Sequence, residues 1–191
     1  MDIFFRLAAL ALHAVRVVYW SVTEKKADSE KPKLEKSSPS KTLKRQLSLF
    51  FGIIMAFQLL GLRIFPFEQT VLVQTIGFIL VVIGITTTML ARYTLGTNWA
   101  HAAEYQIKKG HTLVTGGIYN YIRHPLYSGM FFAVVGAEIV AGSYFFIVAF
   151  FFEIFWGLSQ AKKEEAILTE KFGAEYTRYM ARTKRFLPFV W

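Results

Sequence analysis

The chain has 191 residues, a formal net charge of +9 and a hydrophobic content of 54%, which includes 19 Phe. A disordered chain would hold far fewer apolar residues, and a soluble domain would scatter them by amphipathic periodicity rather than collect them in blocks. The absence of Cys excludes disulfides, thiolate nucleophiles and Cys-bound metals. The length is that of one domain, so we expect residues 1–191 to form a single membrane domain.

Five apolar blocks approach the roughly 20 residues that a helix needs to cross a bilayer. In chain order they cover residues 3–22, 47–64, 70–91, 125–140 and 143–158. The last two are separated only by Ala141-Gly142-Ser143, which predicts a tight helical hairpin. The sequence therefore predicts an all-α integral membrane protein with about five transmembrane helices.

Basic residues mark one side of this predicted bundle. Residues 24–46 carry eight Lys or Arg, residues 92–124 carry four, and the tail after Ser159 carries seven. Five alternating helices place these three segments on one side, which the positive-inside rule makes cytosolic. We expect the N-terminus outside and the C-terminus in the cytosol, at the cytoplasmic membrane of a prokaryote or the endoplasmic reticulum of a eukaryote. The positive charge then indicates contact with anionic membrane lipids, not with nucleic acid.

Two segments outside the blocks have distinctive compositions. Residues 25–45 are rich in Lys, Ser and Pro, which indicates a solvated linker. From Ala161 onward, apolar residues recur on one helical face that Gly173 interrupts. This face consists of Ile167, Leu168, Phe172, Tyr176, Tyr179 and Met180. We expect a C-terminal amphipathic helix that lies on the membrane or folds back over the cytosolic ends of the spans.

The segment before the fourth block carries polar groups suited to a ligand site. Proline disfavours helix at the preceding residue and suits the first helical turn, so His124 should lie at the mouth of the span that Pro125 begins. Backbone N–H groups exposed there can hold an anion or a polar ligand. The hairpin returns Glu164 and Glu165 to the same membrane face. We therefore expect these distant residues to converge on one cytosolic-side pocket.

Each of these residues also has a simpler interpretation. A His at a helix start is often a cap, Tyr and Trp at a membrane edge often form an aromatic belt, and Glu-Glu after Lys-Lys is often a solvated helix end. Glu138 and Glu153 differ, because ionisable groups inside spans are costly and often functional. Glu138 is close enough to the hairpin tip to reach the outer interface. Glu153 is deeper, and both a packed group and a substrate contact stay open for it.

The chain from Leu95 to Phe189 resembles the isoprenylcysteine carboxyl methyltransferase family and its wider relatives, the membrane phospholipid methyltransferases. The resemblance is carried, in order, by LGTNW, HTLVTGGIYNYIRHPLYSG and KKEEAILTEKFGAEYTRYMARTKRFLPF. It implies a pocket for S-adenosylmethionine on the cytosolic face, built by residues 92–191. Residues 1–91, which hold the three N-terminal spans and the charged loop, match the family only in being apolar. The cofactor contacts that it implies are Glu104, His111, Thr112, Leu113, Val114, Tyr119, His124, Pro125, Leu126, Tyr127, Glu164 and Glu165.

The resemblance implies methyl transfer to a lipophilic acceptor, with the carboxylate of a prenylated cysteine as the leading candidate. N-methylation of a phospholipid head group and S-methylation of a small thiol stay open, as does a non-catalytic membrane lipid-binding protein. The sulfonium already activates the methyl carbon, so we expect no metal, and the protein mainly has to position and desolvate the nucleophile. An ionised carboxylate needs no general base, and we assign no catalytic residue.

One position departs from the pattern of the carboxyl methyltransferases. Those enzymes usually carry an Arg four residues before the first Glu of the pair, where this chain has Gln160. A neutral amide cannot give the bidentate, charge-assisted grip of Arg, and Lys162 or Lys163 is a candidate replacement. Glu138 stands where eukaryotic members tend to carry Gln. A negatively charged side chain at this position suits a cationic or amine acceptor. The predicted substrate contacts are Gln160, Lys162 and Glu153.

Overall fold

A computed structural model of the chain describes residues 2–29, 39–62, 64–98 and 112–188. These segments form six α-helices: α1 (Asp2–Ser29), α2 (Pro39–Leu59), α3 (Val71–Leu95), α4 (Pro125–Ala141), α5 (Phe145–Phe172) and α6 (Ala174–Arg182). Two 3-10 turns, η1 (Gly96–Asn98) and η2 (Gly117–Asn120), complete them. The described residues form no β-sheet, so the predicted all-α class is confirmed.

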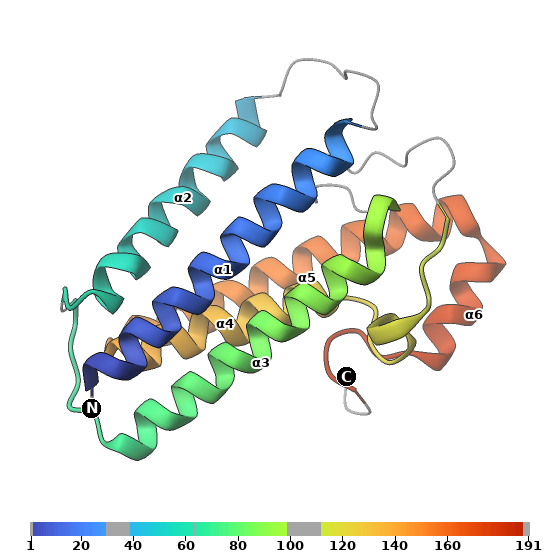
Figure 1. Cartoon of the computed structure of the whole chain (residues 1–191). Coiled ribbons are helices and arrows are strands. Elements are labelled where there is room, and N and C mark those ends of the chain that lie inside the picture. Colours follow the sequence, from blue (N-terminus) through green and yellow to red (C-terminus); the bar gives the residue numbers. More distant parts are fainter. Residues whose placement is uncertain (1, 30–38, 63, 99–111, 189–191) are drawn as a thin grey trace.

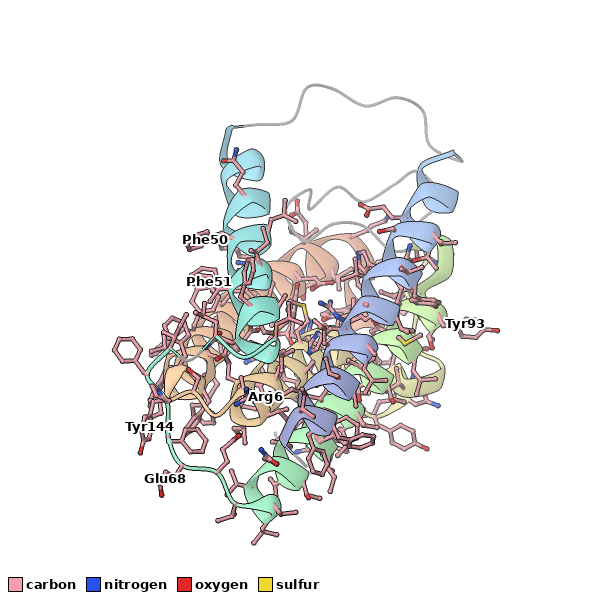
Figure 2. All side chains as sticks on the ribbon, turned by 60° about the vertical axis from the view of Figure 1, so that its left-hand side comes forward. Arg6, Phe50, Phe51, Glu68, Tyr93 and Tyr144 are labelled. Carbon is pink, nitrogen blue, oxygen red and sulfur yellow. The ribbon has the colours of Figure 1, made fainter. Side chains whose placement is uncertain are left out.

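Each of the five predicted apolar blocks is helical over most of its length. Three helices are long and apolar enough to cross a membrane, over Ile3–Glu24, Val71–Leu95 and Phe145–Phe172, and the apolar segments Leu49–Leu59 and Pro125–Ala141 are shorter. Large apolar side chains cover the outer surface of the bundle. Phe50 and Phe51 on α2 are examples that project outward in Figure 2. An apolar exterior of this extent suits contact with lipid.

Helices α3 and α4 form the tightest packing in the bundle, because glycines let their backbones approach. Gly77 and Gly84 on α3 face Gly136 and Gly129 on α4, which makes the pair antiparallel. A Cβ at Gly136 would lie 2.6 Å from the carbonyl oxygen of Gly77, closer than real Cβ contacts come. Small residues at such interfaces are the usual device of membrane helix packing. This close pair is the rigid base from which the start of α4 projects.

The hairpin between α4 and α5 is confirmed at Gly142, whose φ of 73° ends α4 in a left-handed turn. Glu138, one turn before it, is only 4% exposed and lies beside Gln58 of α2. Our expectation that Glu138 reaches the outer interface is therefore wrong. The reason is that α2 and α1 pack over this part of α4.

Three helices extend beyond the blocks that the sequence patterns predict. Helix α5 continues past residue 158, where we end the fifth block, and runs through the Glu164–Glu165 pair until Gly173 stops it at a φ of 52°. Helices α1 and α2 also extend into residues 25–45, to Ser29 and from Pro39, so that segment is not all linker. The run of apolar residues ends at the membrane edge, but helical hydrogen bonding continues until a residue such as glycine interrupts it.

The C-terminal helix folds back over one end of the bundle, as Figure 1 shows for α6 beside η2. Its Tyr176 and Tyr179 are buried, and the Tyr179 hydroxyl donates to the backbone oxygen of Tyr119 at 2.8 Å. The other members of the predicted apolar face, Ile167, Leu168, Phe172 and Met180, are half-buried. The predicted amphipathic helix and its interruption at Gly173 are both confirmed, and α6 closes the end where α4 begins.

Candidate active site

The site is framed by two chain segments that run side by side. The Arg123 and His124 amides donate to the backbone oxygens of Lys184 and Arg185 at 2.8 and 3.0 Å, and the Lys184 amide donates to Tyr121 at 3.1 Å. The Ser128 hydroxyl adds a 2.7 Å bond to the backbone oxygen of Phe186. Pro125 starts α4, as its fixed backbone angle favours. The C-terminal segment thereby holds the start of α4 in place.

Glu165 is the centre of an ion-pair cluster whose cations come from these two segments. Its Oε1 accepts from Arg123 Nε at 3.0 Å and lies 3.2 Å from His124 Nε2. Arg185 completes the cluster, with Nη2 2.6 Å from Oε2 and Nε 3.1 Å from Oε1. Both oxygens of this buried carboxylate are engaged. Glu165 therefore joins α5, the start of α4 and the C-terminal segment.

Glu164, the neighbouring residue, points in a different direction, because successive helical residues are rotated by about 100°. Its Oε2 accepts from the Tyr127 hydroxyl at 3.1 Å and lies 3.5 Å from His124 Nδ1. The Glu164 side chain remains 43% exposed, whereas that of Glu165 is 9% exposed. Glu164 is thus the member of the pair that is open to a ligand.

The two carboxylates determine the charge of His124. Burial alone would lower the pKa of this imidazole, but hydrogen bonds to Glu164 and Glu165 and their negative charges outweigh burial and raise it. The Glu165 carboxylate likewise raises the pKa of Arg185. Burial, and then the charge of Glu164, raise the pKa of Tyr119 well above its usual value. The site therefore favours the protonated form of His124 in its interior and places the Glu164 carboxylate at its open edge.

Aromatic rings surround these charges. The His124 and Tyr127 rings are stacked with centroids 5.5 Å apart, and Phe186 lies 5.8 Å from His124. Trp156 of α5 meets Tyr127 edge-on at 5.5 Å. Such rings offer flat apolar faces and exclude water from neighbouring charges.

The structure brings His124, Tyr127, Glu164 and Glu165 together, as the sequence predicts. Tyr119 is linked to them through Tyr179 and the charge of Glu164. The remaining predicted contacts are distributed as follows: Pro125 and Gln160 are buried, Leu113, Val114, Leu126 and Glu153 are half-buried, Thr112 and Lys162 are exposed, and Glu104 and His111 lie outside the described residues. The ligand roles of all these residues stay predictions.

Four site residues were not predicted to belong here: Arg123, Trp156, Arg185 and Phe186. Arg123 also donates to the backbone oxygens of Met180 and Thr183, at 3.1 and 2.5 Å. For Arg123 the available signal was its adjacency to His124, and for Arg185 and Phe186 it was their place in the RTKRFLPF segment. The signal was weak, because basic residues near a membrane edge are also expected from the orientation rule alone.

Comparison with known proteins places this geometry in a family. A family model described as phospholipid methyltransferase matches residues 72–175, more than half of the chain. The chain belongs to the phospholipid methyltransferase family. The match covers α3, α4 and α5 and therefore includes the start of α4 and the Glu164–Glu165 pair.

Several relatives of this family member are named protein-S-isoprenylcysteine O-methyltransferase. The protein of Saccharomyces cerevisiae is 30% identical over 140 residues, which cover 72% of this chain and 59% of the yeast protein. The human protein is 33% identical over 129 residues, 64% of this chain and 44% of that protein. A probable enzyme of this name from rice (Oryza sativa subsp. indica) is 29% identical, with 81% and 82% covered. The chain thus spans about half the length of the yeast and human relatives.

The fold is also shared with a solved structure. A eukaryotic intramembrane Ras methyltransferase, an isoprenylcysteine carboxyl methyltransferase, superposes with a TM-score of 0.66 over 99% of this chain and 68% of that protein, at 20% identity. This likeness supports the all-α membrane architecture of the family member. It extends over α1 and α2, which the family model does not cover.

Proposed function

We propose that the chain transfers the methyl group of S-adenosylmethionine to the carboxylate of an S-prenylated cysteine or a close analogue. The observation that carries the proposal is the meeting of His124, Tyr127 and Glu164 at one end of the bundle. The relatives named isoprenylcysteine O-methyltransferases support the reaction class. We also propose that residues 92–191 form the catalytic half of a single domain.

The residues at the site fit S-adenosylmethionine. Its ammonium and ribose hydroxyls need an acceptor such as the half-exposed carboxylate of Glu164. Its carboxylate suits the N-terminus of α4, where the helix dipole favours an anion. Half-buried Leu113 and Val114 would accommodate the adenine. When bound, the cofactor supplies a methyl group that its sulfonium activates.

The chain's own task is positioning. The Glu165 cluster fixes the start of α4, and Tyr127 and His124 orient the Glu164 carboxylate. Phe186 and Trp156 exclude water from the same region. Holding reacting groups in line and out of water is the main contribution that a displacement at an activated carbon requires. A carboxylate acceptor is already ionised, so the proposal needs no base.

A second acceptor is favoured by one observation. Gln160 is buried and neutral at the position where carboxyl methyltransferases usually carry Arg. A site without that guanidinium loses a strong carboxylate grip, which favours the amine of a phospholipid head group over a carboxylate. Lys162 stays the candidate replacement for that Arg, and we retain the prenylcysteine as the first candidate acceptor.

The same proposal includes the orientation of the chain in the membrane and the routes by which cofactor and acceptor reach the site. The cofactor reaches the site from the cytosol, and the acceptor enters from the bilayer. The N-terminus lies outside and the C-terminus lies in the cytosol, at the cytoplasmic membrane of a prokaryote or the endoplasmic reticulum of a eukaryote. The proposal names no metal and no nucleic acid as a partner.

Two measurements on the purified full-length chain test the proposal. Calorimetry should detect S-adenosylhomocysteine binding, and Glu164→Gln should weaken it at least ten-fold, with exposed Glu175→Gln as a matched control. Labelled S-adenosylmethionine should then methylate N-acetyl-S-farnesylcysteine, with base-labile label as expected for an ester. Absence of nucleotide binding would favour the non-catalytic lipid-binding protein. Transfer of label only to phosphatidylethanolamine would show that the acceptor is the amine of a phospholipid head group and not a carboxylate.

A further inference from the structure

Arg92 is a buried arginine at the end of a membrane helix, where arginines usually reach water. It lies in the last turn of α3 and is only 3% exposed. Long basic side chains at such a position normally extend their charge to the membrane surface. A cation suits the negative end of the helix dipole, but the dipole does not require the guanidinium to be buried. The burial of Arg92 therefore indicates a further role.

The Arg92 guanidinium joins α3 to α1. Its Nη2 donates to the backbone oxygen of Thr23 on α1 at 3.0 Å. Its Nη1 donates to the backbone oxygen of Gly96 at 2.9 Å, and the guanidinium lies 5.8 Å from the centre of the Trp20 ring. The C-terminal ends of α1 and α3 lie at the same end of the bundle (Figure 1). A guanidinium can bridge the two helix ends because its donors form a rigid planar fork.

The chain just beyond Arg92 holds one of the predicted cofactor contacts. Gly96, with a φ of 52°, ends α3 and begins the 3-10 turn η1. Asn98, the last residue of this turn, accepts with its side-chain oxygen from the Thr112 amide at 3.1 Å. We call residues 94–98 the platform. Because Arg92 holds the Gly96 carbonyl, it acts on Thr112 through the platform.

The platform also carries η2, which contains Tyr119. A Cβ at Gly117 would lie 3.1 Å from the hydroxyl oxygen of Thr94, so η2 rests closely on the platform. Burial and the charge of Glu164 raise the pKa of Tyr119, and the charge of Arg92 opposes them, so the guanidinium lies near this phenol. A second predicted cofactor contact thus rests on the part of α3 that Arg92 joins to α1.

We infer that Arg92 is a positioning residue for the nucleotide: by joining the platform to α1, it holds Thr112 and Tyr119 where the cofactor binds. The inference rests on the proposed function, in which these two residues contact S-adenosylmethionine. It gives α1 a part in nucleotide binding, although the matched family model begins only at residue 72.

The inference predicts a selective kinetic effect. The predicted acceptor contacts, Gln160, Lys162 and Glu153, are on α5, whereas the platform is at the end of α3. A loosened platform should therefore weaken the binding of the nucleotide and leave the binding of the acceptor nearly unchanged.

The main variant is Arg92→Gln, which removes the charge and the planar fork. Calorimetry on the purified full-length chain should show S-adenosylhomocysteine binding weakened about ten-fold, since bonds from a charged group are lost. The KM for S-adenosylmethionine should rise by about the same factor, and the KM for N-acetyl-S-farnesylcysteine should change less than about two-fold. Tyr93→Ala is the matched control, because Tyr93 is 79% exposed and projects away from the bundle (Figure 2).

Gly136→Ala separates positioning from loss of stability. It disturbs the α3–α4 packing at Gly77, which lies roughly 22 Å from Arg92 along α3. It should lower the melting temperature without changing the affinity for S-adenosylhomocysteine. Native affinity in Arg92→Gln, an equal rise of both KM values, or an equal loss of affinity in Gly136→Ala would each overturn the inference. Absence of S-adenosylhomocysteine binding by the native chain would reject the proposed function itself.

Asn98→Ala keeps the inference testable if Arg92→Gln does not fold. It separates the platform from Thr112 without changing the contacts to α1, and should weaken S-adenosylhomocysteine binding about five-fold. Where both variants fold, the double variant should bind little more weakly than Arg92→Gln alone, because both substitutions interrupt one support. Native affinity in Asn98→Ala, or losses that multiply fully in the double variant, would contradict an action through the platform.

Discussion

Loss of charge at Glu165 should destabilise the fold strongly, whereas loss of charge at its neighbour Glu164 should change stability little. Glu165→Gln removes the negative charge that Arg123, His124 and Arg185 share at 3.0, 3.2 and 2.6 Å. Removing one partner of a buried ion pair costs about 3–5 kcal/mol. We expect the low end, about 3 kcal/mol, because the Arg185 side chain is 27% exposed and can regain hydration. For a chain of this size, that lowers the melting temperature by about 6–12 °C.

The matched variant is Glu164→Gln, which loses the charge of a side chain that is 43% exposed and keeps an oxygen for the Tyr127 hydroxyl. It should change the melting temperature by no more than about 4 °C, since partly exposed ion pairs contribute up to about 1 kcal/mol. Thermal unfolding in detergent, followed by Trp fluorescence, measures both. Equal losses of melting temperature in the two variants would refute the assignment of Glu165 as the structural member of the pair.

Three further outcomes follow from the described contacts. The raised pKa of His124 means that its protonated form stabilises the fold, fully below its unfolded value near 6.5 and no longer once pH has risen through the folded pKa. The melting temperature of the native chain should therefore exceed that of His124→Gln most at pH 6 and least at pH 9, and a constant difference would contradict this. Tyr127→Phe removes the 3.1 Å bond to Glu164 and should weaken S-adenosylhomocysteine binding about ten-fold, as calorimetry would show. Gly136→Ala should lower the melting temperature by at least about 4 °C, whereas Gly52→Ala, with nothing within 4 Å, should not.

Much of the fold could be predicted because it follows from local rules. Blocks of apolar residues mark membrane helices, Gly142 marks the hairpin and Gly173 marks the break before α6. The lengths of α1, α2 and α5 could not be predicted from hydropathy, since a helix outside the membrane continues without an apolar signal. The antiparallel glycine contacts between α3 and α4 depend on the relative rotation of two helices, which no single segment encodes.

The candidate site was predictable in part for a related reason. His124 and Glu164 could be placed on one membrane face because the α4–α5 hairpin reverses the chain once and returns it to the face where α4 begins. Arg185 could not be placed, because its position depends on α6 folding back and on backbone bonds between residues 121–124 and 184–185. Such bonds pair atoms that every residue carries. The sequence therefore holds no side-chain signal for them.

The geometry of the carboxylate pair explains why two adjacent glutamates serve the site better than one. A single carboxylate that held Arg123, His124 and Arg185 would have both oxygens occupied, as Glu165 has, and nothing left for a ligand. A single carboxylate facing the ligand would leave three cations without their counter-charge, which burial makes expensive. Successive helix positions differ by about 100°, so one residue can turn inward to the cations while its neighbour turns to the open edge. His124 contacts both, at 3.5 and 3.2 Å, and thus couples the charge that stabilises the fold to the charge offered to the ligand.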